Sequence, residues 1–172
     1  MNPNVQPEDI EILKTQLGRV PRGVQAIETR CPVGHPQVIK VYPLLRKDDE
    51  AEPFPTLFWL TCPNIIDQIS RLEHQGLIQK LESLLQEDEV MMQAYHANHR
   101  QYLKERWETL TPEDQQWLED QGWKENYLSR GIGGIANWDS LKCLHLQYAH
   151  HLARENEIGQ WLDEHFTINS CL

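Results

Sequence analysis

Apolar and polar residues follow two different periods along the chain, and the period changes near residue 63. Before that point, short runs rich in β-branched and aromatic residues are typical of strands. These runs are residues 24–30, 38–42 and 56–61. A Pro/Gly-rich turn at 31–36 and a charged loop at 46–55 separate them. The pattern predicts a small three-stranded antiparallel sheet.

After residue 63, apolar residues recur every three or four positions, which is the period of an amphipathic helix. The predicted helices span residues 64–74, 77–85, 90–110, 112–122, 138–155 and 158–166. Thr111 followed by Pro112 is a strong helix start, and Asn137 is expected to cap a long helix from Trp138 to about Glu155. The fold class is therefore α+β, a small sheet followed by a predominantly helical remainder.

Length and charge narrow the class of protein. A chain of 172 residues suits a single domain over 1–172, with an N-terminal arm at 1–15 and a C-terminal helix and tail at 155–172. The net charge of −10 argues against a surface that binds duplex nucleic acid. No apolar stretch approaches the ~20 residues of a membrane span. We expect a cytoplasmic protein that binds a small molecule or a protein partner; its oligomeric state is left open.

The four cysteines are Cys31, Cys62, Cys143 and Cys171, spread singly along the chain without a C-x-x-C pair. Without an export signal the thiols are expected to be reduced. Cys171 lies in a tail and is assigned no role. Each of the others has a plain interpretation as a small buried hydrophobic residue.

Three cysteines also have positions that suit metal ligation. Cys31 and Cys62 each precede a proline at a strand end, and Cys62 comes directly before a helix, whose N-terminus favours a thiolate. Thiolates supplied singly from distant elements are typical of an iron–sulfur cluster or a catalytic metal. We predict Cys31, Cys62 and Cys143 as ligands of an iron–sulfur cluster or zinc, with His35 as a possible fourth ligand.

The predicted helix at 138–155 places further candidates. At ~100° per residue, Cys143 shares a face with His150, ~10.5 Å away along the axis, as two walls of one pocket. His145 points away, so Cys143 and His145 are not expected to share one ion. Lys142, His145 and His150 are the candidates for acid–base or anion-holding roles beside the metal.

Two other patterns have mainly structural interpretations. The segment GIGG at 131–134 follows no strand, so it is not a dinucleotide fingerprint, although its N–H groups suit an anion. His96 and His99, three residues apart on one helix, are expected on a solvated face rather than as a metal pair.

Three functions remain open from the residues. The first is a metalloprotein whose open coordination position acts on a substrate. The second is a non-enzymatic interaction protein whose acidic helices, such as 90–110, dock a partner while the cysteines are structural. The third is a thiol enzyme with Cys62 as the nucleophile.

The chain also resembles a bacterial family of uncharacterised proteins called DUF501, over about residues 16–154. The motifs that carry the resemblance are LGRVPRGV at 17–24, RCP at 30–32, PFPTLFWLTCP at 53–63, SRLE at 70–73, GIGG at 131–134, KCLH at 142–145 and AH at 149–150. The resemblance implies that the marked positions include Cys31, Cys62 and Cys143. The family often has CPCGRP where this chain has CPVGHP, so a four-thiol site does not carry over, and His35 is the alternative ligand in that turn.

Overall fold

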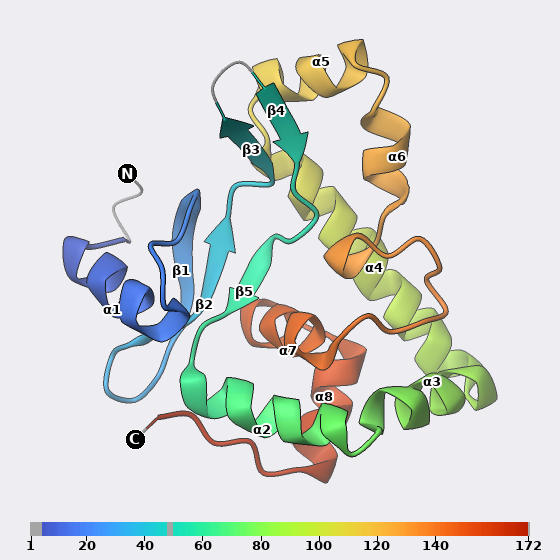
Figure 1. The fold of residues 1–172 in the computed structure, drawn as a ribbon. Helices are drawn as coiled ribbons and strands as arrows, with labels where there is room; N and C mark the ends of the chain where they lie inside the picture. Colours follow the sequence, from blue (N-terminus) through green and yellow to red (C-terminus); the bar gives the residue numbers. More distant parts are fainter. Residues whose placement is uncertain (1–4, 48–49, 172) are drawn as a thin grey trace.

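The structure is a computed structural model that describes residues 5–47 and 50–171. Its first part consists of α1 (Pro7–Leu17), β1 (Val24–Arg30), β2 (Pro36–Val41), β3 (Leu44–Lys47), β4 (Glu50–Pro53) and β5 (Phe58–Leu60). The helical part consists of α2 (Pro63–His74), α3 (Leu77–Glu87), α4 (Glu89–Thr109), α5 (Pro112–Asp120), α6 (Lys124–Ser129), the 3-10 turn η1 (Ile132–Gly134), α7 (Leu144–Ala153) and α8 (Glu157–His165). Figure 1 shows α1 and α7 on opposite sides of the sheet.

The main sheet has the strand order β1-β2-β5, and both pairings are antiparallel. Side chains of β2 alternate between two layers, because successive residues of a strand face opposite sides. Val38 packs into the main core with the helices, whereas Ile39 and Val41 pack with Leu13 of α1. The α+β class and the three-stranded antiparallel sheet predicted from the sequence are confirmed.

The segment expected to be a charged loop at 46–55 is instead a hairpin. Strands β3 and β4 pair antiparallel, with Leu44 opposite Pro53. Leu44 is buried in a small second core with Leu110, Leu118 and Tyr127. This packing against α5 and α6 fixes the hairpin, and a sequence pattern dominated by charged residues does not reveal it.

Most of the predicted helices are confirmed, including the one that starts at Thr111. The hydroxyl of Thr111 accepts a hydrogen bond from the backbone N–H of Asp114 at 3.2 Å, and Pro112 occupies the first turn. The main core lies between the sheet and α2, α3, α4, α7 and α8. Among the described residues, no helix combines the length and hydrophobicity needed to cross a bilayer.

The long helix predicted from Trp138 is wrong at its start, because α7 begins only at Leu144. Asn137 does accept a hydrogen bond from the N–H of Asp139 at 3.1 Å, but only a short turn follows. The true start is fixed by a distant residue: the N–H of Leu144 donates to Oε1 of Glu73 at 2.5 Å. A carboxylate from α2 therefore takes the place of a local cap.

Candidate functional site

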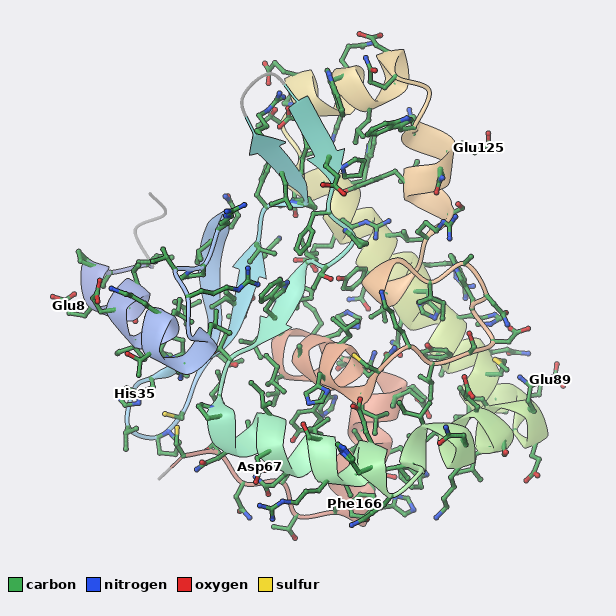
Figure 2. The ribbon with its side chains drawn as sticks, viewed as in Figure 1. Glu8, His35, Asp67, Glu89, Glu125 and Phe166 are labelled. Carbon is green, nitrogen blue, oxygen red and sulfur yellow. The ribbon has the colours of Figure 1, made fainter. Side chains whose placement is uncertain are left out.

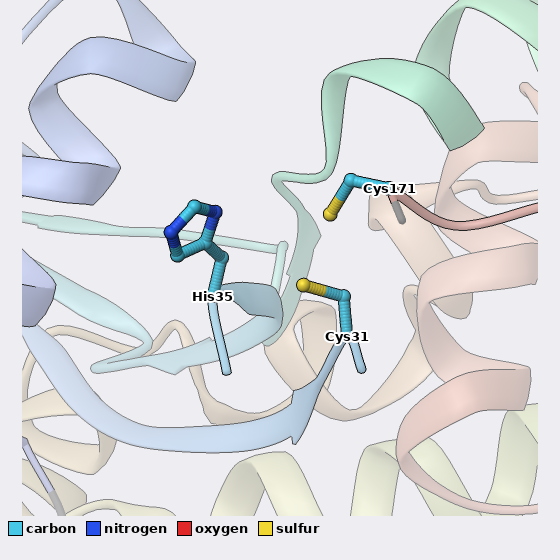
Figure 3. A group of neighbouring side chains, drawn as sticks. All are labelled: Cys31, His35 and Cys171. Carbon is cyan, nitrogen blue, oxygen red and sulfur yellow. The ribbon is translucent and has the colours of Figure 1, made fainter. Parts of the chain in front are cut away.

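Three cysteines and a histidine meet where the turn after β1, the start of α2 and the C-terminal segment come together. Sγ of Cys31, Sγ of Cys171 and a ring nitrogen of His35 all lie within 4.8 Å of one another (Figure 3). Sγ of Cys62 lies 3.9 Å from Sγ of Cys171. We call these four residues the thiol cluster. Cys31 and His35, which come from one turn, lie directly beside Cys171, and Cys62 joins the group through its contact with Cys171.

The turn from Cys31 to His35 is folded so that its two ends meet. The N–H of Cys31 donates to the carbonyl of His35 at 2.9 Å, and the N–H of Gly34 donates to the carbonyl of Cys31 at 2.8 Å. Gly34 has φ +88°, a conformation that favours glycine. Figure 2 shows His35 on this turn. The geometry brings the imidazole back beside the thiol.

The surroundings of Cys31 stabilise its thiolate. Burial acts to raise the pKa of Cys31, but hydrogen bonds from the Cys171 thiol and from the backbone of Val33 and His35 outweigh it and lower the pKa below its usual value. In the same contact the pKa of Cys171 is raised, first by its hydrogen bond to Cys31. A thiolate at Cys31 is the form that a metal ion requires.

Cys62 is the N-cap residue of α2, as the sequence predicts, with Pro63 at the first helical position. It has no exposed surface, and its carbonyl accepts the N–H of Ile66 at 3.0 Å. The thiol of Cys62 therefore lies at the start of α2, next to the C-terminal segment.

Cys171 is the member of the cluster that sequence reasoning missed. The C-terminal segment lies along α2, and Asn169 exchanges two hydrogen bonds with the side chain of Gln68, at 3.1 and 2.7 Å. Ile168 packs against the main core. A single cysteine in a short segment outside any helix or strand has no periodic signal, so only the path of the chain reveals its partners.

Cys143 lies outside the thiol cluster. It belongs to a second group, with Glu73 and His145, whose ligand atoms also lie within 4.8 Å of one another. Cys62 caps the first turn of α2 and Glu73 lies in its last turn, which separates the two positions by about 16 Å along the helix axis. The structure does not bring Cys143 together with Cys31 and Cys62.

The expectation that Cys143 and His145 point apart is wrong, because Cys143 precedes α7 in an extended conformation. The polar atoms of this second group already have partners. Glu73 accepts the Leu144 N–H, and Nε2 of His145 lies 3.1 Å from the hydroxyl of Ser70. Burial raises the pKa of Cys143, which opposes a thiolate. This second group therefore suits the anchoring of α7 better than a metal.

His150 and Lys142 occupy different environments. His150 has no exposed surface, its ring stacks on Phe58 with centroids 5.7 Å apart, and its Nδ1 lies 3.1 Å from the amide nitrogen of Asn156. Burial lowers the pKa of His150 to about 4. Lys142 is exposed, and its Nζ donates to the carbonyl of Gly133 at 2.9 Å. His150 is thus a neutral core residue, whereas Lys142 lies at the wall of a cavity.

Comparison with known proteins gives one result. Residues 27–164 match the model of a family described as "Protein of unknown function (DUF501)". The matched range includes Cys31, His35, Cys62 and Cys143 and ends before Cys171. No curated protein and no solved structure matches the chain.

Proposed function

The chain belongs to the DUF501 family, and we propose that it is a zinc-binding protein in which Cys31, Cys62, Cys171 and His35 hold the ion. The observation that carries the proposal is the convergence of these donors from three separate segments. Three thiolates and one imidazole form a common ligand set of closed structural zinc sites.

The distance between two sulfurs supports a single ion rather than a cluster. Thiolates about 2.3 Å from a tetrahedral zinc ion lie about 3.8 Å from each other. Sγ of Cys62 and Sγ of Cys171 are 3.9 Å apart. In a [4Fe–4S] cluster each thiolate binds a different iron and the thiolates are spaced more widely, so this separation favours two thiolates on one tetrahedral metal over such a cluster.

The site would act mainly as a structural tie. Cys171 comes from the C-terminal segment, Cys62 from the start of α2, and Cys31 with His35 from the turn after β1. These segments meet at the edge of the main core, where Cys62 is buried and His35 is exposed. A zinc ion would fasten the C-terminal segment to the sheet, and the binding free energy would stabilise the fold.

The test is metal analysis of protein purified without chelators, with cysteine variants side by side. We expect about one zinc ion per wild-type chain. Cys31→Ser and Cys171→Ser should lose most of the zinc. Cys143→Ser is the matched control, because Cys143 lies outside the thiol cluster, and it should keep the wild-type content.

Other results would overturn this assignment. If the purified protein contains iron and absorbs visible light, the site holds an iron–sulfur cluster and not a single zinc ion. A wild-type protein that is folded but contains no metal would contradict the zinc proposal and leave the cysteines as core residues. A Cys62–Cys171 disulfide, found by mass spectrometry after anaerobic purification, would also contradict it and would make these two cysteines a redox pair. Equal zinc loss in Cys143→Ser would mean that the thiol cluster is not the site.

A further inference from the structure

A second site lies away from the thiol cluster, in a cavity of about 480 Å³ between α4, α6 and the glycine segment 131–134. Its size falls within the range of about 300–1,000 Å³ for small-molecule sites. The residues that decide its chemistry are Arg106, Arg130, Lys142, Gly133, Gly134 and Glu52. Three cations and one carboxylate therefore line this cavity in a chain whose net charge is −10.

Arg106 is the most unusual of these cations, because it is only 1% exposed. Its guanidinium donates to three backbone carbonyls, those of Pro55 at 3.1 Å, Arg130 at 2.8 Å and Tyr127. Its Nε is buried without a hydrogen-bond partner. Within the described part of the chain, no carboxylate forms an ion pair with it. A buried positive charge without a counter-ion is costly, and a bound anion would remove that cost.

Arg130 and Lys142 are held toward the same cavity by uncharged partners. Nε of Arg130 donates to Oδ1 of Asn126 at 3.0 Å, and Nζ of Lys142 donates to the carbonyl of Gly133 at 2.9 Å. Among the side chains that the structure describes, neither cation is paired with an acid. These contacts orient the two side chains and leave their charges available to a ligand.

The glycine segment gives the cavity a wall of bare backbone. Gly133 and Gly134 have φ of +69° and +81°. A Cβ on Gly134 would lie 2.8 Å from Cβ of Pro55, so a larger residue would displace the wall. Trp123, which is 41% exposed, and Tyr127 also line the cavity. The aromatic residues suit an organic group, and the cationic residues suit an anion.

We propose that this cavity binds the phosphate group of a small phosphorylated organic molecule. The formal charge of the lining side chains, three cations against Glu52, matches a dianion, and arginine forms paired hydrogen bonds with phosphate oxygens. The site is independent of the zinc proposal, because it contains none of the four residues of the thiol cluster.

The test is calorimetric titration at constant ionic strength with inorganic phosphate, phenyl phosphate and acetate as probes. We expect saturable binding of both phosphates, and tighter binding of phenyl phosphate because its ring meets Trp123. Arg130→Gln and Lys142→Gln should each weaken binding about ten-fold. Lys104→Gln is the matched control, an exposed lysine on α4 outside the cavity, and it should bind like the wild type.

Several outcomes would overturn the proposal. The first is that neither phosphate binds saturably. The second is that Arg130→Gln, Lys142→Gln and Lys104→Gln weaken binding equally. The third is that acetate binds as tightly as phosphate. If inorganic phosphate binds tightly and phenyl phosphate binds no more tightly, the ligand is the free phosphate ion. That result would overturn the proposal that the ligand is an organic phosphate. Repeating the titration with Cys171→Ser excludes phosphate bound to zinc, because that variant leaves the cavity intact.

Discussion

The backbone N–H of Ile132 donates a hydrogen bond to Nδ1 of His99 at 3.0 Å in the interior of the protein. His99 is fully buried, not on the solvated helix face expected from the sequence. Because Nδ1 accepts this bond, the ring is neutral, and its Nε2 is buried without a partner. Burial lowers the pKa of His99 to about 3, and the neighbouring His96, His150 and Arg100 add to the effect. The glycine segment beside the proposed phosphate cavity thus depends on a neutral imidazole.

The first prediction concerns pH. His99 and His150 have folded-state pKa values of about 3 and about 4, below the value of 6.5 for a free imidazole. The unfolded chain therefore binds more protons below pH 6.5, and the free energy of unfolding falls as the pH falls. Each imidazole should remove about 2 kcal/mol between about pH 7 and about pH 5.

Urea denaturation at these two pH values measures the effect. His99→Gln keeps an oxygen that can accept the Ile132 N–H but cannot titrate in this range. The variant should therefore lose about half as much stability on acidification as the wild type. A loss identical to that of the wild type would show that His99 is not buried in its neutral form.

The second prediction concerns two glycines with nearly the same backbone conformation. Gly133 has φ +69° and Gly18 has φ +67°. A Cβ at 133 would lie 2.3 Å from Cδ1 of Leu146, whereas a Cβ at 18 meets nothing within 4 Å. Gly18→Ala should cost about 1 kcal/mol from backbone strain alone, and Gly133→Ala about 2 kcal/mol more. Equal losses in denaturation experiments would mean that the contact with Leu146 relaxes freely.

The third prediction concerns a carboxylate that holds two cations. Glu105 accepts hydrogen bonds from Arg154 at 2.6 and 2.9 Å and from Lys40 at 2.9 Å, and its side chain is 20% exposed. Glu105→Gln leaves both cations without this partner and should lower the free energy of unfolding by about 2 kcal/mol.

The matched control for Glu105 is Glu108, three residues further along the same helix. Glu108 is 60% exposed and lies 3.9 Å from Lys104, so Glu108→Gln should cost less than about 0.5 kcal/mol. Chemical denaturation of the two variants compares them directly. A loss for Glu108→Gln as large as that for Glu105→Gln would contradict the difference in burial.

The fourth prediction follows from the proposed zinc site. Removing zinc with a chelator should free the C-terminal segment from the turn after β1, because Cys171 is its ligand. A serine carboxypeptidase, which needs no metal, should then shorten the wild-type chain faster, while Cys31→Ser should be cleaved quickly with or without chelator. Mass spectrometry of the products measures the rate. A rate that the chelator leaves unchanged in the wild type would show that no metal fastens this segment.

Local patterns predicted those elements whose signals lie within a few residues of one another. The alternation of β2 places Val38 and Ile39 in different layers, and Thr111 caps α5 through its own side chain. The start of α7 escaped prediction because its partners are distant. Leu141 and Leu144 donate to Glu82 and Glu73, carboxylates on two other helices. The prediction counted angular positions as if a helix began at Trp138, and it therefore placed Cys143 within that helix. In the structure Cys143 lies just before the first residue of α7.

The sequence by itself determined the α+β class, the main strands and helices, the cap position of Cys62 and the turn that joins Cys31 to His35. These features depend on side-chain periodicity and on turn and cap residues, which act over one or two turns of chain. Only the tertiary structure decided which cysteines meet. Sγ of Cys171 reaches Cys62 across more than half of the chain because the C-terminal segment packs along α2. Such a contact depends on the burial of surfaces far apart in sequence, and no local pattern encodes it.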